Sequence, residues 1–371
     1  MKLALCGFPP LAEQLQTGLQ GFEFKYFIGD FVSTRGRDNF PVALPPISFF
    51  DFRRLINAGE LDGVIIAEDG RKPFTREVIR GCKFYGIPKV GVTDLTFFNS
   101  EKPVRWLNPY KIFLPYLESD ITDRCNLNCR GCCHFANFRF EDEFYPLENY
   151  RRDLNRIAQT CDVFTFCLLG GEPFILNNIE RYLLEARQCF PYANLGIFTN
   201  GLLIPSLPKK ILDILREAKF TVLISAYPPT IKSLDKIKTV IDANSISCRV
   251  IKTVENFSAQ MTLTGNNNPA KAINACRCGQ ARSIRNGKIY KCPIDSACYK
   301  FAKKFNIKKF ASPTGVDIYA ENFSSLLEVL DGSVELCGWC AEQHRQIPWE
   351  PTNNPKLEDW LADPAEAKAL R

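Results

Sequence analysis

The stretch that decides the fold reads Asp123-Arg124-Cys125-Asn126-Leu127-Asn128-Cys129-Arg130-Gly131-Cys132-Cys133-His134. Three and then two residues separate its first three cysteines. Thiolate is the ligand that soft iron–sulfur centres select, and spacing this short lets one loop wrap a single metal site. A four-iron cluster capped by this triplet would keep its fourth iron open for a ligand other than cysteine. A structural zinc site is the alternative, although zinc usually takes paired CxxC knuckles.

The composition is that of a globular protein with more than one domain. The chain has 371 residues, 46% of them hydrophobic, and holds sixteen cysteines but only two histidines. Residues 1–10 carry one lysine and too short an apolar run for a signal peptide. No stretch approaches the roughly 18 apolar residues that a membrane span needs. We therefore expect a cytoplasmic protein with no membrane partner, whose cysteines bind metal more readily than they form disulfides.

The first part of the chain, residues 1–112, predicts a small parallel α/β domain. Expected strands are 2–8, 22–28, 62–67 and 89–92, and expected helices are 11–19, 50–58 and 75–85. The turn Gly7–Pro10 lacks the glycines of a dinucleotide fingerprint, so a nucleotide cofactor site is not expected there. The topology loosely resembles Rossmann-like domains that precede sugar-modifying enzymes, which favours a docking or scaffold role.

A second strand–helix series follows and predicts a parallel barrel, complete or partial, over residues 113–265. Expected strands are 113–121, 163–169, 195–199, 220–225 and 248–254. Expected helices are 146–160, 177–189, 206–218 and 231–243. Active-site groups of such barrels gather at the carboxyl ends of the strands. The cysteine loop lies at the end of the first strand, as this arrangement requires.

Further candidate residues lie at the ends of later expected strands. In chain order they are Gly170-Gly171-Glu172-Pro173, Thr199-Asn200 and Ser225. Together with the CxxxCxxC loop, their order resembles that of the radical S-adenosylmethionine (SAM) superfamily. The resemblance implies a partial (β/α)6 barrel with a 4Fe-4S cluster on Cys125, Cys129 and Cys132. It also implies that the GGEP turn meets the methionine amino group of SAM through Glu172. Thr199, Asn200 and Ser225 would meet its carboxylate or ribose.

The cysteine loop departs from the superfamily pattern before its third cysteine. The superfamily usually has an aromatic residue there, but this chain has Gly131, so Phe135 is the candidate for an adenine contact. Cys133 is expected to be a packed or free thiol. His134 and His344 have no partner motif, and neither is given a catalytic role.

A cysteine-rich region occupies residues 266–345, ahead of a tail at 346–371. Asn286-Gly287 between alternating residues predicts a type I′ hairpin. Cys276, this hairpin, Cys292 and the Cys337–Cys340 knuckle resemble the twitch domain, the shortened relative of the SPASM domain. The resemblance implies an auxiliary 4Fe-4S cluster on Cys276 (or Cys278), Cys292, Cys337 and Cys340. A structural zinc on the same four residues is the alternative.

Positive charge is concentrated in the same region. Residues 271–310 hold eleven lysines or arginines and one acid, Asp295. Such charge would raise a cluster's potential or hold an anionic substrate such as a nucleotide sugar. The run lacks the interleaved aromatic residues of a single-stranded nucleic-acid surface, so nucleic acid is not expected as a partner.

The resemblance implies reductive cleavage of SAM and hydrogen abstraction from a substrate. Because twitch enzymes include an aminocyclitol alcohol dehydrogenase, oxidation or epimerisation of a sugar-like carbinol is the leading hypothesis. Flavodoxin or ferredoxin would be the electron donor. Maturation of a ribosomally made peptide is the runner-up, although the N-terminal domain lacks the winged-helix pattern of leader binding. A non-enzymatic, metal-stabilised binding module is the third reading, but it leaves the GGEP turn and the open triplet without a purpose.

Overall fold

The computed structural model describes residues 1–7, 15, 21–28, 44–67, 73–87, 89–93, 104–138, 140, 144–276, 278 and 281–370. The chain divides into two compact units. The first unit comprises residues 1–116 and 160–164, and the second comprises residues 117–159 and 165–371. Among the described residues, none of the helices combines the length and apolar character that crossing a membrane would take.

The first unit is built on a mostly parallel sheet with the strand order β3-β2-β1-β4-β5-β6. The strands are β1 (Lys2–Gly7), β2 (Glu23–Ile28), β3 (Pro46–Ile47), β4 (Gly63–Ala67), β5 (Lys89–Val92) and β6 (Arg105–Trp106). The helices are α2 (Phe49–Asn57) and α3 (Pro73–Phe84). Every residue of β4 is buried, which explains its uninterrupted apolar sequence. The predicted α/β domain is confirmed, while the helix expected at 11–19 lies outside the described residues except for Leu15.

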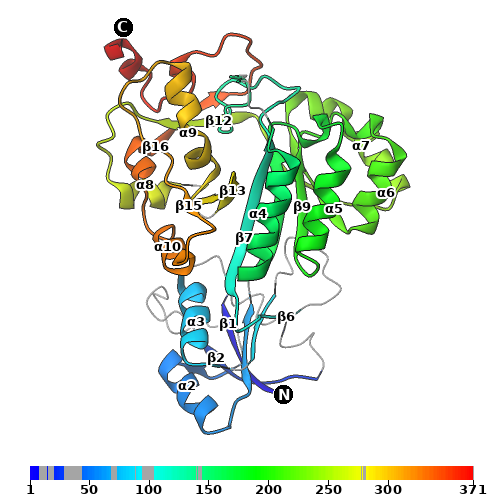
Figure 1. Ribbon diagram of the computed structural model, residues 1–371, viewed down its shortest axis with the longest axis vertical. Helices are drawn as coiled ribbons and strands as arrows, with labels where there is room; N and C mark the ends of the chain where they lie inside the picture. The colour runs from blue at the N-terminus through cyan, green and yellow to red at the C-terminus, as the bar shows by residue number, and fades with distance from the viewer. Residues whose placement is uncertain are drawn as a thin grey trace. The chain divides into compact units, whose positions relative to one another are not determined.

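The second unit carries the predicted strand–helix series on an eight-stranded sheet, with the order β11-β10-β9-β8-β7-β13-β14-β15. The five strands of the series are β7 (Ile112–Thr122), β8 (Cys161–Gly170), β9 (Asn194–Thr199), β10 (Phe220–Ala226) and β11 (Ser247–Thr253). Between them run α4 (Leu147–Thr160), α5 (Ile179–Cys189), α6 (Lys209–Glu217) and α7 (Pro228–Ala243). Figure 1 shows these helices following one another around the strands. Strands β8 to β11 pair in parallel, so their carboxyl ends share one edge of the sheet.

The predicted hairpin joins this sheet beside β7. It comprises β13 (Ser283–Arg285) and β14 (Lys288–Tyr290), and β15 (Val316–Asp317) pairs with β14. Asn286 and Gly287 both have positive φ, at 49° and 75°, as a type I′ turn requires. The sequence rule for Asn-Gly is therefore confirmed at this turn.

The rest of the C-terminal region contains a two-stranded sheet and helices, and short 3-10 helices occur both there and within the strand–helix series. Strand β12 (Asn256–Met261) lies outside the large sheet and pairs antiparallel with β16 (Cys340–Pro348). The helices are α8 (Pro269–Ala275), α9 (Pro293–Lys304) and α10 (Phe323–Val329). Short 3-10 helices are η1 (Pro173–Ile175), η2 (Ile204–Ser206), η3 (Glu335–Trp339), η4 (Leu357–Asp359) and η5 (Pro364–Leu370). The β12–β16 pair brings the end of the chain back to the strand ends of the barrel-like sheet.

Candidate functional site

Three cysteines lie close together on the loop that follows β7. Burial raises the pKa of Cys125 to about 12, and the neighbouring thiolate of Cys132 adds to the increase. Burial also raises the pKa of Cys129 to about 12, and it raises the pKa of Cys132. Without a bound cation these thiols stay protonated at neutral pH, so metal binding at this loop must release protons.

The donor set of the cysteine loop is chemically suited to an iron–sulfur cluster. Among the residues that the structure describes, no group of three or more Cys, His, Asp or Glu side chains is placed to hold a single metal ion. A structural zinc needs four ligands at about 2.0–2.3 Å from one ion. A four-iron cluster would give each of the three cysteines an iron of its own and would leave its fourth iron open.

A segment near the C-terminus, residues 349–361, pairs with the cysteine loop, and we call it the C-terminal strap. The backbone N–H of Arg130 donates to the carbonyl of Glu350 over 2.8 Å. The backbone N–H of Thr352 donates to the carbonyl of Asn128 over 2.6 Å. The two stretches thus meet as an antiparallel bridge. The loop that carries the cysteines is therefore fixed by residues more than two hundred positions away.

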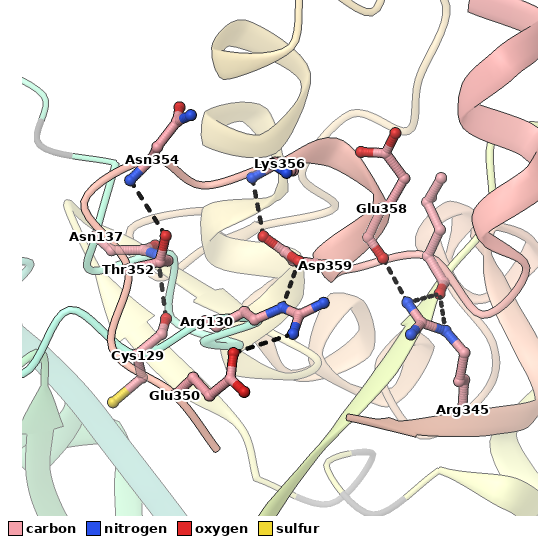
Figure 2. Close-up of polar contacts among 11 residues, drawn as sticks. Cys129, Arg130, Asn137, Arg345, Glu350, Thr352, Asn354, Lys356, Glu358 and Asp359 are labelled. Carbon is pink, nitrogen blue, oxygen red and sulfur yellow. Dashed lines mark hydrogen bonds and ion pairs between the residues drawn. The ribbon is translucent and has the colours of Figure 1, made fainter. Parts of the chain in front are cut away.

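Side chains reinforce this pairing (Figure 2). The Arg130 guanidinium lies 2.6 Å from the buried carboxylate of Asp359 and 3.3 Å from the exposed carboxylate of Glu350. From within the loop, the Asn137 amide donates to the carbonyl of Cys129 over 3.0 Å. The Arg130 side chain is two-thirds buried and lies between two carboxylates, so it holds the middle of the loop in place.

Two tryptophans of the strap donate hydrogen bonds to the loop. The Trp349 indole N–H donates to Sγ of Cys129 over 3.2 Å, and the Trp360 indole N–H donates to the carbonyl of Cys132 over 2.9 Å. The sequence reasoning missed this segment, because it treated residues 346–371 as a tail without a role. One available signal was that the region holds two of the chain's four tryptophans.

The two glycines of the GGEP turn allow β8 to approach the base of the cysteine loop. A Cβ on Gly170 would lie 2.1 Å from the carbonyl oxygen of Thr122, and a Cβ on Gly171 would lie 2.0 Å from that of Arg124. The backbone N–H of Gly171 donates to Thr122 and that of Glu172 donates to Arg124, each over 2.7 Å. The absence of a Cβ at both positions therefore lets the backbone of the turn pack directly against the backbone at the start of the cysteine loop.

Glu172 is fully buried and links two strand ends. Its carboxylate accepts hydrogen bonds from the Thr199 hydroxyl (2.8 Å) and from the backbone N–H groups of Asn200 (2.8 Å) and Phe174 (3.2 Å). Burial raises the pKa of Glu172 to about 7, against the opposing effect of these donors. The carboxylate therefore ties the turn after β8 to the end of β9, and it ionises near neutral pH.

The other predicted strand-end residues lie around the same edge. The Asn200 amide donates to Oδ1 of Asn126 over 2.6 Å and lies 3.9 Å from Sγ of Cys125. Pro173 begins η1 directly after Glu172. Ser225 is half-buried near the end of β10. The structure thus brings the end of β9 into contact with the cysteine loop.

Phe135, the candidate for an adenine contact, lies in an aromatic cluster. It is 2% exposed, and its ring stacks on Phe138 at a centroid distance of 5.3 Å. Phe301 and Trp360 lie 5.9 and 6.2 Å away. An adenine contact through Phe135 would require this cluster to open.

Tyr227 is a residue near the site to which the sequence analysis gave no separate role. Burial raises its pKa, and the thiolates of the cysteine loop add to the increase, so its hydroxyl lies near these thiols. Its ring stacks on Phe257 at 6.1 Å and lies 6.2 Å from Trp349 of the C-terminal strap. The end of β10, β12 and the strap thus meet beside the cysteine loop.

The C-terminal cysteines also gather in one region. Burial raises the pKa of Cys340, and the thiolates of Cys276, Cys337 and Cys278 add to this effect. Burial likewise raises the pKa of Cys292, with a contribution from Cys278. The backbone N–H of Cys278 donates to Sγ of Cys276 over 3.3 Å. Cys276 thus lies near Cys337 and Cys340, whereas Cys278 lies near Cys292 and Cys340.

A histidine that the sequence analysis left without a role has a partner in the structure. Nδ1 of His134 lies 3.1 Å from a carboxylate oxygen of Asp120 on β7. Burial lowers the pKa of His134, but Asp120 and Cys133 outweigh it, so the pKa is raised well above the usual value. The side chain of Cys133 thus lies near the same histidine.

Buried charges connect the cysteine loop with the C-terminal region. Asp123 forms a bidentate ion pair with Arg285 on β13, at 2.8 and 2.9 Å. Lys300 on α9 lies 2.6 Å from the same carboxylate and is almost fully buried. Part of the basic run at 271–310 is therefore committed to internal ion pairs.

Residues 119–262 match the radical SAM superfamily. Two similar curated proteins are GTP 3′,8-cyclases. The Heliobacterium modesticaldum protein is 29% identical over 118 residues, which is 28% of this chain and 36% of that protein. The Pelotomaculum thermopropionicum protein is 31% identical over 104 residues, which is 28% of this chain and 32% of that protein. The chain thus matches about a third of the length of these relatives.

Two solved structures also show similarity. The crystal structure of BtrN in complex with AdoMet and 2-DOIA is 18% identical, with a TM-score of 0.35, and covers 63% of this chain and 98% of that one. Streptococcus suis SuiB bound to S-adenosylmethionine is 18% identical, with a TM-score of 0.33, and covers 54% of this chain and 43% of that one.

Proposed function

Residues 119–262 form a radical SAM domain, and from this premise we propose that the protein cleaves SAM reductively and takes a hydrogen atom from a substrate carbon. When bound, a four-iron cluster with an open iron supplies the electron that splits SAM into methionine and a 5′-deoxyadenosyl radical. The observation that carries the proposal is the meeting of the three-cysteine loop with the ends of β8 and β9. Glu172 contacts the base of the loop, and Asn200 contacts its Asn126.

The chain's own residues would bind and orient SAM at these strand ends. Glu172 would supply negative charge for the methionine ammonium while it fixes the end of β9. Thr199, Asn200 and Ser225 would offer polar groups to the carboxylate or ribose. Because Glu172 is buried and water is excluded there, its negative charge would attract the ammonium group more strongly than a charge at an exposed position.

We also propose a second four-iron cluster on Cys276 or Cys278 with Cys292, Cys337 and Cys340. Neighbouring cysteines of this group raise the pKa of Cys292 and of Cys340, which supports a common location for the thiols. Four cysteine ligands would leave no iron open, so this cluster would serve the substrate rather than SAM. Oxidation of a carbinol carbon radical releases one more electron and a proton, and the second cluster is the acceptor that we propose for the electron.

The proposed substrate is an anionic, sugar-like molecule that is oxidised or epimerised at a carbinol carbon. Lys288, Lys303 and Lys304 are exposed and support anion binding. Lys291 and Lys300 of the basic run are buried, so we exclude them from the residues proposed to bind the anion. The relatives are named as cyclases of GTP, itself an anionic nucleotide with a sugar. A nucleotide cyclisation is accordingly the second candidate function.

Anaerobic reconstitution tests the proposal. We expect about eight iron and eight sulfide per chain, the sum of two four-iron clusters. A Cys125→Ala, Cys129→Ala, Cys132→Ala variant should keep about half of each and form no 5′-deoxyadenosine from SAM and dithionite. Candidate sugar nucleotides deuterated at the carbinol carbon should transfer deuterium into 5′-deoxyadenosine. Stoichiometric zinc without sulfide would refute the proposal.

A further inference from the structure

The hydrogen bond from Trp349 to Cys129 ends on a sulfur atom that the proposed cluster would use. We propose that Trp349 is a positioning residue of the first cluster, whose indole N–H donates to the ligand sulfur of Cys129 and raises the cluster's reduction potential. This inference rests on the proposed function. It makes the C-terminal strap part of the cluster site, although it lies outside the radical SAM match at 119–262.

The indole is held in this orientation from both sides. The backbone N–H of Trp349 donates to the carbonyl of Glu255 over 2.8 Å, directly beyond the β12–β16 pair. Its ring lies 6.2 Å from the ring of Tyr227, which is itself stacked on Phe257. On the other side the strap is bonded to the cysteine loop through the backbone of Arg130. The indole N–H is therefore preorganised toward the sulfur.

Electrostatics gives the direction of the effect. Reduction adds negative charge to the cluster and its thiolate sulfurs, so an N–H dipole aimed at one of these sulfurs stabilises the reduced form more than the oxidised form. Hydrogen bonds to the sulfurs are among the factors that set such potentials. Cys129 is only 5% exposed, so water does not screen or replace the donor there.

The strap offers its own control. Trp360 is a second indole that bonds to the same loop, but its N–H donates to the backbone carbonyl of Cys132 and not to a sulfur. If indole contacts merely hold the loop, loss of either N–H should have similar consequences. If the sulfur contact matters electrostatically, only Trp349 should affect the potential.

The test is a redox titration of reconstituted Trp349→Phe and Trp360→Phe proteins followed by electron paramagnetic resonance. The signal that added SAM perturbs identifies the first cluster. Because one hydrogen bond to a ligand sulfur is lost, we expect Trp349→Phe to make reduction up to about tenfold less favourable, which is a fall of about 59 mV for one electron. Trp360→Phe should keep the wild-type potential.

A wild-type potential in Trp349→Phe that retains its iron would overturn the inference and leave Trp349 a purely structural residue. Equal shifts in both variants would also overturn it. The absence of any SAM-perturbed signal in wild type would instead refute the proposed function. These three outcomes are distinct from one another.

If Trp349→Phe does not retain iron, spectroscopy of the labelled wild-type protein tests the inference instead. Indole-¹⁵N-tryptophan labelling and pulsed resonance of the reduced, SAM-perturbed cluster should show coupling to one indole nitrogen. The same coupling should persist in labelled Trp360→Phe. A labelled wild-type protein without such coupling would contradict the sulfur contact, whatever its catalytic activity.

Discussion

Substitution of Gly171 by alanine should break the junction between β8 and the cysteine loop. The new Cβ would lie 2.0 Å from the carbonyl oxygen of Arg124, a backbone atom that cannot rotate away. The turn must therefore retreat and weaken two hydrogen bonds of 2.7 Å, from Gly171 to Thr122 and from Glu172 to Arg124. Two such bonds contribute about 1–3 kcal/mol, and overpacking costs about 1–3 kcal/mol more. We expect a loss of about 4 kcal/mol in the free energy of unfolding.

Calorimetry of the anaerobic protein measures this loss. For a unit of about 250 residues, each kcal/mol shifts Tm by about 2–4 °C, so Gly171→Ala should unfold about 8–16 °C below wild type. Gly332→Ala is the control, because its nearest neighbour would be a carbonyl oxygen at 3.6 Å and its φ is not positive. It should match wild type or gain up to about 1 kcal/mol. Equal Tm values for the two variants would refute the close approach that we describe.

Three further predictions test the site. Cys337→Ala should still cleave SAM slowly with dithionite but should not convert the substrate, and wild-type turnover in this variant would show that the second cluster is dispensable. Because the pKa of Glu172 is raised to about 7, its contribution to stability should be present below about pH 4.5 and fall by about 3 kcal/mol as pH rises to about 7. Glu172→Gln should flatten this slope in urea titrations, and an unchanged slope would argue against the raised pKa. Asp359→Ala should lower the free energy of unfolding by about 1.5–3 kcal/mol through its buried bond to Arg130, whereas Glu350→Ala, on the exposed side of the same guanidinium, should cost less than about 1 kcal/mol.

Local sequence patterns placed most of the strand–helix series, but they did not predict the helices α8, α9 and α10 or the strands β12 and β16. Short buried runs such as Gly63–Ala67 and Phe220–Ala226 read as strands, because a strand covered on both faces is apolar throughout. The hairpin at Asn286-Gly287 was predictable because both turn residues need positive φ. The cysteine spacing also predicted that three cysteines lie on one loop after β7, which the structure confirms. Each of these signals is contained within a few neighbouring residues.

Long-range packing was not predictable in this way. Nothing near Trp349 in the sequence indicates that its indole meets Cys129, 220 residues earlier. The burial of Glu172 and the enclosure of Phe135 depend on side chains from separate elements. The ion pair of His134 with Asp120 joins a loop to the preceding strand through geometry that carries no motif. The sequence suggested Glu172 and Phe135 as candidates, but tertiary structure decides which side chains point into the site.

The separation of the cysteine loop from the C-terminal strap has a consequence for biogenesis. The ribosome makes Cys129 first and Trp349 220 residues later, which takes roughly 10–45 s at 5–20 residues per second. During that interval a nascent chain exposes the three thiols without the hydrogen bonds that fix their loop. Iron–sulfur loading should therefore be most efficient after release of the finished polypeptide. Chains shortened before residue 349 should accumulate as apoprotein even though every cysteine of the first site is present.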